Sequence, residues 1–297
     1  MLKIDDVGHS IGKLAVVILT FNEEENIAQA LVSVQGWADE VFVLDSLSYD
    51  RTVEICSEFD CTVINNKFEN FSKQRNFALK QLGISSEWVL FLDADEWIPS
   101  DLKDEISQVI KSSPIENGYY LNRKFIWMGA WVKRGYYPTW TLRLFRHDKG
   151  RCEDRAVNEH MIIDGCTARL NCDYIHEDLK PISDWSKKHI NRARLEAIEL
   201  FNKRDEIGYT EVEVTLFGSQ EKRKRWIRYK VWNRLPPLIR PFLYFLFRYV
   251  ISGGFLDGKH AFTYNFLQAF WFPMLIDIFY LELIYRENKK LNNINDC

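Results

Sequence analysis

The feature that most constrains this sequence is a short apolar run, residues 88–92, which ends in two carboxylates one residue apart, Asp93 and Asp95. A run of this length is typical of a buried strand. Oxygen ligands at its end suit a hard cation such as Mg²⁺ or Mn²⁺, and such ions often take further ligands from substrate phosphates. The pair therefore predicts a metal-dependent enzyme acting on a phosphate ester or diphosphate. The structural alternative is that the acids cap a helix beginning near Ser100.

Two further apolar runs, residues 13–20 and 40–45, each lead through a polar turn into a helical pattern. Buried parallel strands joined by crossover helices have this appearance. The sequence therefore predicts an α/β, doubly wound sheet, in which ligands bind at the carboxyl ends of the strands. Thr20, Asp45 and the acids after residue 92 all fall at such ends.

Four motifs in order resemble the inverting family 2 glycosyltransferases of the GT-A fold. They are VVILTFNEEEN at 16–26, VLDSLSYDRT at 43–52, FSKQRNFAL at 71–79 and LDADE at 92–96, the last resembling the family's DxD element. Through residues 140–146, 151–160 and 170–176 the chain is most similar to the bacterial subgroup that includes lipopolysaccharide core β-glucosyltransferases. The resemblance implies a Rossmann-like, mostly parallel GT-A sheet. It also implies transfer of a hexose from a nucleotide sugar, by family habit UDP-linked, in surface polysaccharide biosynthesis.

The resemblance also implies roles for individual residues. Asp93 and Asp95 would hold the metal that stabilises charge on the departing diphosphate, with His176 completing this site. The implied nucleotide-binding residues are Thr20, Asn22, Glu23, Asp45, Lys73 and Arg75. Among them, Asp45 would accept from the base and Glu23 from the ribose. Each also has an ordinary structural interpretation, as a helix cap, a turn residue or a solvated helix face.

Inversion also requires a base on the acceptor side, placed for attack opposite the leaving group. Acids gather in residues 153–160, and Glu159 is the first choice because the subgroup often has His-Glu where this chain has Asn158-Glu159. Asp154 is the alternative, because the wider family commonly uses the Asp of a Glu-Asp pair. His160 is a weaker alternative, since a lone histidine is more often structural.

An aromatic and basic stretch, residues 119–140, separates the metal motif from these acids. Tyrosine and tryptophan rings stack on sugars and hydrogen-bond at their edges, so an acceptor site is expected here. Its predicted residues are Trp127, Trp131, Tyr136 and Trp140. The alternative is that these rings pack over the sheet. A net charge of −3 and a pI near 6.1 argue against nucleic acid as the partner.

The C-terminal third has a different composition, so we predict a catalytic domain over 1–200 and a helical, basic-aromatic region over 201–297. Residues 221–240 carry eight Lys or Arg against one acid, with interleaved aromatic residues, as in a helix lying on an anionic membrane. Residues 262–284 are long enough to span a bilayer, but Pro273, Asp277 and Glu282 argue against it. A monotopic attachment is expected. The alternative is that these helices pack together or across a homo-oligomer interface.

Six cysteines without CxxC spacing predict reduced thiols, and the N-terminus lacks a secretory layout, so we expect the cytoplasmic face of the inner membrane. Attachment there predicts a lipid-linked saccharide acceptor. Two other functions stay open. A nucleotidyltransferase is disfavoured because no glycine-rich loop follows the first strand, and a non-catalytic membrane adaptor is disfavoured by the retained acids Asp93, Asp95 and Glu159.

Overall fold

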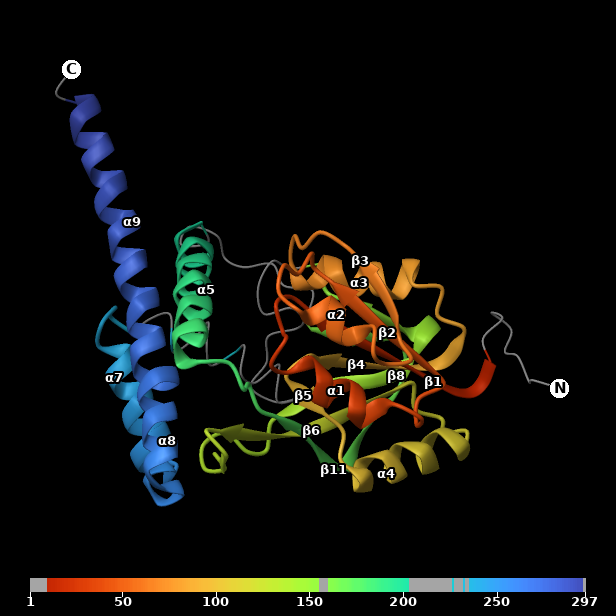
Figure 1. Ribbon diagram of the computed structural model, residues 1–297. Coiled ribbons are helices and arrows are strands. Elements are labelled where there is room, and N and C mark those ends of the chain that lie inside the picture. Colours follow the sequence, from red (N-terminus) through yellow and green to blue (C-terminus); the bar gives the residue numbers. More distant parts are fainter. Residues whose placement is uncertain (1–9, 155–159, 203–225, 227–231, 233–234, 296–297) are drawn as a thin grey trace. The chain divides into compact units, whose positions relative to one another are not determined.

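The computed structural model describes residues 10–154, 160–202, 226, 232 and 235–295 (Figure 1). Two compact units divide the chain. The first comprises residues 1–131 and 136–179, and the second comprises residues 132–135 and 180–297. The division lies just before α5 (Ile182–Asn202), whereas the sequence analysis placed a boundary near residue 200.

The first unit consists of short strands alternating with helices in its N-terminal half and mainly of strands thereafter. Its strands are β1 Ser10–Thr20, β2 Glu40–Asp45, β3 Thr62–Asn65, β4 Ser86–Asp93, β5 Glu96–Trp97, β6 Gly118–Trp127, β7 Ala130–Trp131, β8 Trp140–Arg146, β9 Gly150–Cys152, β10 Met161–Ile163 and β11 Thr167–His176. Its helices are α1 Ile27–Val34, α2 Thr52–Cys56, α3 Phe71–Gln81, α4 Ser100–Lys111 and the 3-10 helix η1 His147–Lys149.

The main sheet has the order β3-β2-β1-β4-β8-β6-β11-β5, with β7 paired to β6. Strands β1 to β4 run parallel, which confirms the predicted α/β fold with crossover helices. The other half is mixed: β8 runs antiparallel to both β4 and β6, and β11 is parallel to β6 but antiparallel to β5. This arrangement brings the end of β4 and the adjacent β5 close to β8 and β11, which follow much later in the sequence.

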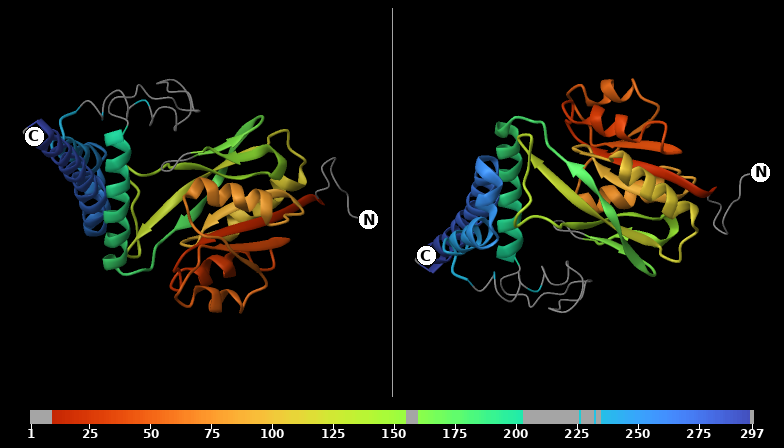
Figure 2. Two further views of the ribbon diagram at one scale, coloured as in Figure 1. Left: turned by 90° about the horizontal axis from the view of Figure 1, so that it is seen from above. Right: turned by 90° about the horizontal axis from the view of Figure 1, so that it is seen from below.

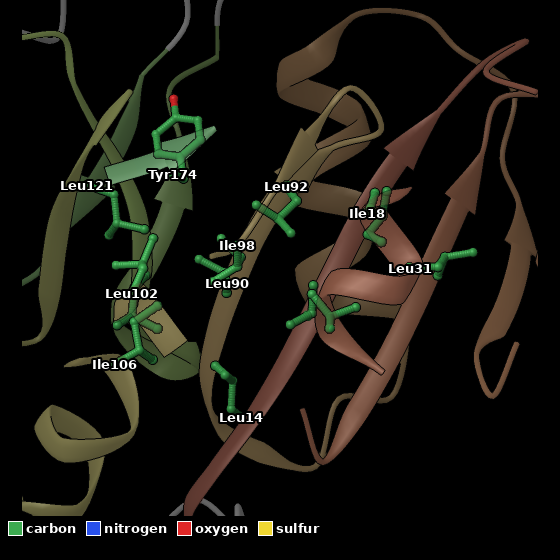
Figure 3. Close-up of a cluster of buried hydrophobic side chains, with 14 of the residues drawn as sticks. Leu14, Ile18, Leu31, Leu90, Leu92, Ile98, Leu102, Ile106, Leu121 and Tyr174 are labelled. Carbon is green, nitrogen blue, oxygen red and sulfur yellow. The ribbon is translucent and has the colours of Figure 1, made fainter. Parts of the chain in front are cut away.

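The apolar residues of β1 alternate between two cores, as strand geometry requires. Val16 and Ile18 face one core together with residues of α1 and α4, part of which Figure 3 shows. Ala15 and Val17 face the opposite core, which includes Ala78 of α3. Burial on both faces explains why this strand is an unbroken apolar run.

The second unit consists of helices joined by short loops over its described residues, together with the loop 132–135. It contains α5, α7 Arg240–Phe245, the π-helix η3 Leu246–Ile251, the 3-10 helix η4 Gly254–Asp257, α8 Gly258–Asn265, the π-helix η5 Phe266–Trp271 and α9 Phe272–Asn295. Helices α5 and α9 lie side by side (Figures 1 and 2), with Ala193 and Ala197 packed against Phe272 and Ile276.

One helical run, Gly254–Lys289, is long and apolar enough to cross a membrane, judged by length and composition. It includes the segment 262–284 that the sequence analysis considered. Asp277, one of the acids weighed against spanning, is buried and pairs with the guanidinium group of Arg240, with an Nε to Oδ1 distance of 2.7 Å. Most of the predicted basic helix over 221–240 lies outside the described residues.

Candidate active site

The loops after β1 and β2 interlock at the carboxyl edge of the sheet. Thr20 and Asp45 are register partners at the ends of these strands. Asn22 has a left-handed φ of 53°, and its backbone N–H donates to Ser48 Oγ at 2.8 Å. Ser48 N–H in turn donates to the buried Asp45 carboxylate at 2.8 Å, and Tyr49 N–H donates to Asn22 Oδ1 at 3.0 Å. The two loops therefore form one rigid edge that contains three predicted nucleotide-binding residues.

Thr20 and Glu23 occupy different environments at this edge. Among the described residues, the buried Thr20 hydroxyl has no hydrogen-bond partner, which is unusual for a buried polar atom. The Glu23 carboxylate instead accepts from Asn26 Nδ2 at 2.8 Å, and that amide also donates to Asp178 at 3.0 Å. Thr20 thus presents an unused polar atom, whereas the Glu23 carboxylate is already bound by Asn26, which also contacts the loop after β11.

Helix α3 carries the two basic residues that were predicted to bind the nucleotide, Lys73 and Arg75, and the two differ in exposure. Lys73 is half-exposed and pairs with Glu69 one turn earlier. Arg75 is largely buried, and its Nη2 lies 3.5 Å from Asp93 Oδ1. Arg75 therefore adds positive charge at the DxD element, while Lys73 lies on the solvent side of its helix.

Three potential metal ligands converge where β5 pairs with the end of β11. Ligand atoms of Asp95, Glu96 and His176 all lie within 4.8 Å of one another. His176 Nε2 is 3.6 Å from Asp95 Oδ2, and its Nδ1 is 3.5 Å from Glu96 Oε1. Carboxylate oxygen and imidazole nitrogen are a donor set that suits Mn²⁺ and similar ions. These residues fit the expected divalent metal.

The same two carboxylates control the protonation of His176. Burial would lower the pKa of the imidazole, but the nearby charges of Asp95 and Glu96 outweigh burial and raise the pKa above its ordinary value of 6.5. A proton therefore competes with a metal ion for this ring up to a higher pH than for an ordinary imidazole.

Asp93 lies outside this group and has other partners. Arg143 Nη2 from β8 donates to Asp93 Oδ2 at 2.8 Å and to Glu96 Oε1 at 2.6 Å. Burial would raise the pKa of Asp93, but the charges of Arg143 and Arg75 hold it well below its usual range. The predicted metal residues thus separate: Asp95 and His176 lie together, and Asp93 is held by two arginines.

Glu96 and Arg143 are the residues that the sequence analysis did not single out. Glu96 directly follows the Asp pair, and its side chain is 1% exposed. Arg143 interrupts the apolar strand β8, where Leu142, Leu144 and Phe145 are all buried. A lone arginine inside a buried strand needs a carboxylate partner, and that pattern was the available signal.

The strand before the predicted base is anchored to α3. The Cys152 N–H donates to Asn76 Oδ1 at 2.9 Å, and Asn76 Nδ2 donates to the Cys152 carbonyl at 3.0 Å. Ser72 Oγ donates to the carbonyl of Glu153 at 2.6 Å. Asp154 follows directly and is exposed. Glu159, the first choice for the base, lies outside the described residues. The backbone carbonyl of His160 accepts from Glu153 N–H at 2.8 Å.

The aromatic residues predicted to bind the acceptor differ in exposure. Trp127 is only 5% exposed and stacks on Phe125, so it contributes to the core. Trp131, Tyr136 and Trp140 are half-buried. Trp131 makes an edge contact with Tyr137, and the Arg169 guanidinium lies 4.8 Å from the Trp140 ring centroid. The half-buried rings keep surface that a saccharide can contact.

Sequence comparison agrees with the motifs. Residues 15–155 match the family described as Glycosyl transferase family 2. The chain is 38% identical over 100 residues to the uncharacterized glycosyltransferase RT0209 of Rickettsia typhi, covering 34% of each protein. It is 36% identical over 97 residues to the SPbeta prophage-derived glycosyltransferase SunS of Bacillus subtilis, covering 32% of this chain and 22% of SunS. The chain spans about a third of the length of curated relatives such as RT0209.

Two solved structures are similar over most of the chain. Residues 1–349 of S. aureus TarS in complex with UDP give 20% identity and a TM-score of 0.42, covering 86% of this chain and 78% of that one. The mannosyltransferase PcManGT of Pyrobaculum calidifontis, in complex with GDP-Man and Mn²⁺, gives 17% identity and a TM-score of 0.48, covering 91% and 87%. Residues 15–155, just under half of the chain, are thus similar to family 2 glycosyltransferases.

Proposed function

We propose that this protein is an inverting, metal-dependent hexosyltransferase. It takes the sugar from a nucleotide sugar, most simply a UDP-sugar, and transfers it to a lipid-linked saccharide at the cytoplasmic face of the bacterial inner membrane. The product belongs to surface polysaccharide or lipopolysaccharide core synthesis. The observation that carries the proposal is the convergence of Asp95, Glu96 and His176 beside the strand ends of a domain similar to family 2 glycosyltransferases.

The donor occupies the edge formed by the loops after β1 and β2. Asp45 accepts from the base, and the unpartnered Thr20 hydroxyl offers a further hydrogen bond to the nucleoside. Arg75, 3.5 Å from Asp93, supplies positive charge on the diphosphate side. These residues come from the ends of β1 and β2 and from α3, so the carboxyl edge of the parallel half of the sheet and its neighbouring helix supply all of them.

Asp95 and His176, with Glu96, hold Mg²⁺ or Mn²⁺. The ion supplies Lewis-acid stabilisation of the negative charge on the leaving diphosphate. The Arg143 guanidinium balances the negative charge of two carboxylates, because its Nη2 donates to Glu96 Oε1 at 2.6 Å and to Asp93 Oδ2 at 2.8 Å. Without that guanidinium, the carboxylates gathered at this site would repel one another and the diphosphate. Arg143 is therefore a positioning residue for the metal ligands.

Acceptor attack requires removal of a proton from its hydroxyl on the side opposite the leaving group. Asp154, exposed after β9, or Glu159 takes this proton. Anchoring of Cys152 and Glu153 to α3 fixes the strand from which Asp154 projects. The half-buried rings of Trp131, Tyr136 and Trp140 stack against the acceptor sugars.

Membrane attachment follows from the helical unit. Its described residues expose large apolar side chains, among them Phe242, Phe247, Ile251 and Leu256. A surface of this kind suits a bilayer interface, where a lipid-linked acceptor is found. Residues 262–284 lie on the membrane in this proposal, in a monotopic arrangement.

Metal-stimulated release of UDP from UDP-sugars by the purified full-length chain tests the chemistry. Loss of an outer-shell partner of a metal ligand costs roughly 10–100-fold. Asp95 is a direct ligand in this proposal, so Asp95→Asn should reduce the release of UDP by more than that. Asp104→Asn, an exposed acid on α4, is the matched control and should behave as wild type. Retention of metal-stimulated release by Asp95→Asn would refute the assigned metal site. Transfer of labelled sugar into the lipid fraction of bacterial membranes tests the acceptor class.

A further inference from the structure

The helical unit contains an antiparallel helix pair. Its first arm is α7 with η3, and its second arm is α8 with η5. Ring contacts between Phe242 and Phe270, with centroids 4.8 Å apart, and between Tyr249 and Phe262, at 5.4 Å, establish the antiparallel order. The arms meet at residues 252–257, where Gly253 has a left-handed φ of 74° that favours glycine. Residues 250–259 are called the hairpin tip below.

The first arm is too short to cross a bilayer. It consists of two six-residue segments, α7 and η3. At about 1.5 Å per residue it extends for roughly 18 Å, whereas the hydrocarbon core is about 30 Å thick. An apolar hairpin with such an arm therefore fits the interfacial region of one leaflet.

The hairpin tip holds a loop that comes from the middle of the chain. The Asp257 carboxylate accepts from the backbone N–H groups of Lys133 and Arg134, at 2.9 and 2.6 Å, and also pairs with the Arg134 guanidinium. The Asp257 side chain is only 6% exposed. A Cβ on Gly135 would lie 3.2 Å from the carbonyl oxygen of Arg248, so the loop packs closely on the first arm. Residues 132–135 are thus part of the helical unit.

Apolar and cationic side chains combine on this surface. The hairpin tip exposes Val250, Ile251, Phe255 and Leu256, each by 48% or more. Lys259 of the tip and Lys133 of the held loop are also exposed, whereas the Arg134 guanidinium is paired with Asp257. Single exposed apolar residues are ordinary, but four on one turn with cations around them match the anionic headgroup and acyl boundary of a bilayer.

We propose that the hairpin tip inserts into an anionic lipid surface and that Asp257 couples this insertion to the placement of the loop 132–135. Trp131 and Tyr136 are the chain neighbours of this loop, and each residue spans at most about 3.6 Å. The backbone of both residues therefore lies within one residue's reach of the loop that Asp257 binds. This inference rests on the proposed function, in which these rings contact a lipid-linked acceptor.

Vesicle binding by the full-length protein tests the surface without relying on activity. Vesicles of phosphatidylcholine alone are compared with vesicles that also contain phosphatidylglycerol. Replacing Phe255 and Leu256 together by serine should reduce partition onto the anionic vesicles by about tenfold or more. The matched control replaces two exposed apolar residues of the other unit, Val32 and Ile115, by serine and should bind as wild type.

Three outcomes would overturn the surface assignment. These are unchanged vesicle binding by the tip variant, equal binding of wild type to both kinds of vesicle, and a tip variant that loses self-association while keeping vesicle binding. The last outcome would identify the tip as a contact between copies of this chain.

Substitution of Asp257 tests the coupling. Asp257→Ala should raise the KM for the membrane-borne acceptor, and Asp257→Asn, which keeps an oxygen for the two N–H donors, should raise it less. Both variants should keep vesicle binding and UDP release in solution, which verifies folding. An unchanged acceptor KM would refute the coupling. Absence of UDP release by wild type would instead refute the proposed function, because vesicle binding is measured separately.

Discussion

Replacing Arg143 by leucine tests whether this guanidinium holds the acidic site together. Arg143 bridges Asp93 and Glu96 from β8, and its side chain is 8% exposed. Leucine fills much of the same volume without a charge. The substitution therefore leaves two carboxylates close together with their main cationic partner removed.

The burial of the two carboxylates determines how much unfolding free energy the substitution removes. Removing one partner of a buried ion pair costs about 3–5 kcal/mol, because the remaining charge stays buried without compensation. Glu96 is 1% exposed and bears most of this cost, whereas Asp93 is 34% exposed and keeps Arg75 at 3.5 Å. We therefore expect a loss near the lower end, about 3 kcal/mol. For a unit of this size that lowers the melting temperature by roughly 6–12 °C.

Thermal and urea unfolding of the full-length chain, followed by tryptophan fluorescence, measures this loss. Arg143→Lys keeps the charge but not the fork of donors and should lie between wild type and leucine. Arg51→Leu is the control, because it removes one partner of an exposed pair with Glu54 and should leave the melting temperature unchanged. If Arg143→Leu were as stable as this control, the buried ion-pair account would be wrong.

Three further predictions concern other parts of the chain. Thr20→Val should leave stability unchanged but weaken UDP binding by roughly 2–10-fold in calorimetry, since the hydroxyl is unpartnered in the free protein; stronger UDP binding would contradict this. Because the pKa of His176 is raised above 6.5, its ring stays protonated to higher pH, so Mn²⁺ affinity should fall as pH drops through that raised value. His176→Asn should flatten this dependence, and a persisting slope would exclude His176 as its source. Asp277→Leu should destabilise the helical unit by about 3–5 kcal/mol in thermal unfolding, and adding Arg240→Leu should restore most of the loss; an equally unstable double variant would contradict the pairing.

The parallel half of the fold was predictable because its information is local. Strands β1, β2 and β4 are each an apolar run that ends in polar residues, so the placement of Thr20, Asp45 and Asp93 at strand ends required only periodicity and turn residues. The predicted α/β fold is confirmed by the parallel order of β1 to β4.

The mixed half was not predictable in the same way. Arg143 reaches Asp93 because β8 pairs antiparallel with β4, and His176 reaches Glu96 because β11 pairs with β5. These registers depend on packing between segments about fifty to eighty residues apart, which single-sequence patterns do not encode. Only the structure therefore shows that Asp93 pairs with arginines and lies apart from the group of Asp95, Glu96 and His176.

Buried ion pairs recur in both units and have a common physical basis. Arg143 with Glu96, and Arg240 with Asp277, each place a guanidinium against a carboxylate that is 1% exposed. Such pairs are weak evidence for stability but fix one geometry, since any other arrangement leaves a buried charge uncompensated. In the first unit this geometry orders the potential metal ligands. In the second it joins the start of α7 to α9.

The central claim is that Asp95 and His176 hold the metal that binds the diphosphate of the donor. Anomalous diffraction from crystals of the full-length protein soaked with UDP and Mn²⁺ tests it most directly. We predict a manganese peak about 2.0–2.3 Å from an Asp95 oxygen and from a His176 nitrogen, bridged to the diphosphate, with the uracil near Asp45. Manganese and UDP bound elsewhere, with neither within coordination distance of Asp95, would contradict the account.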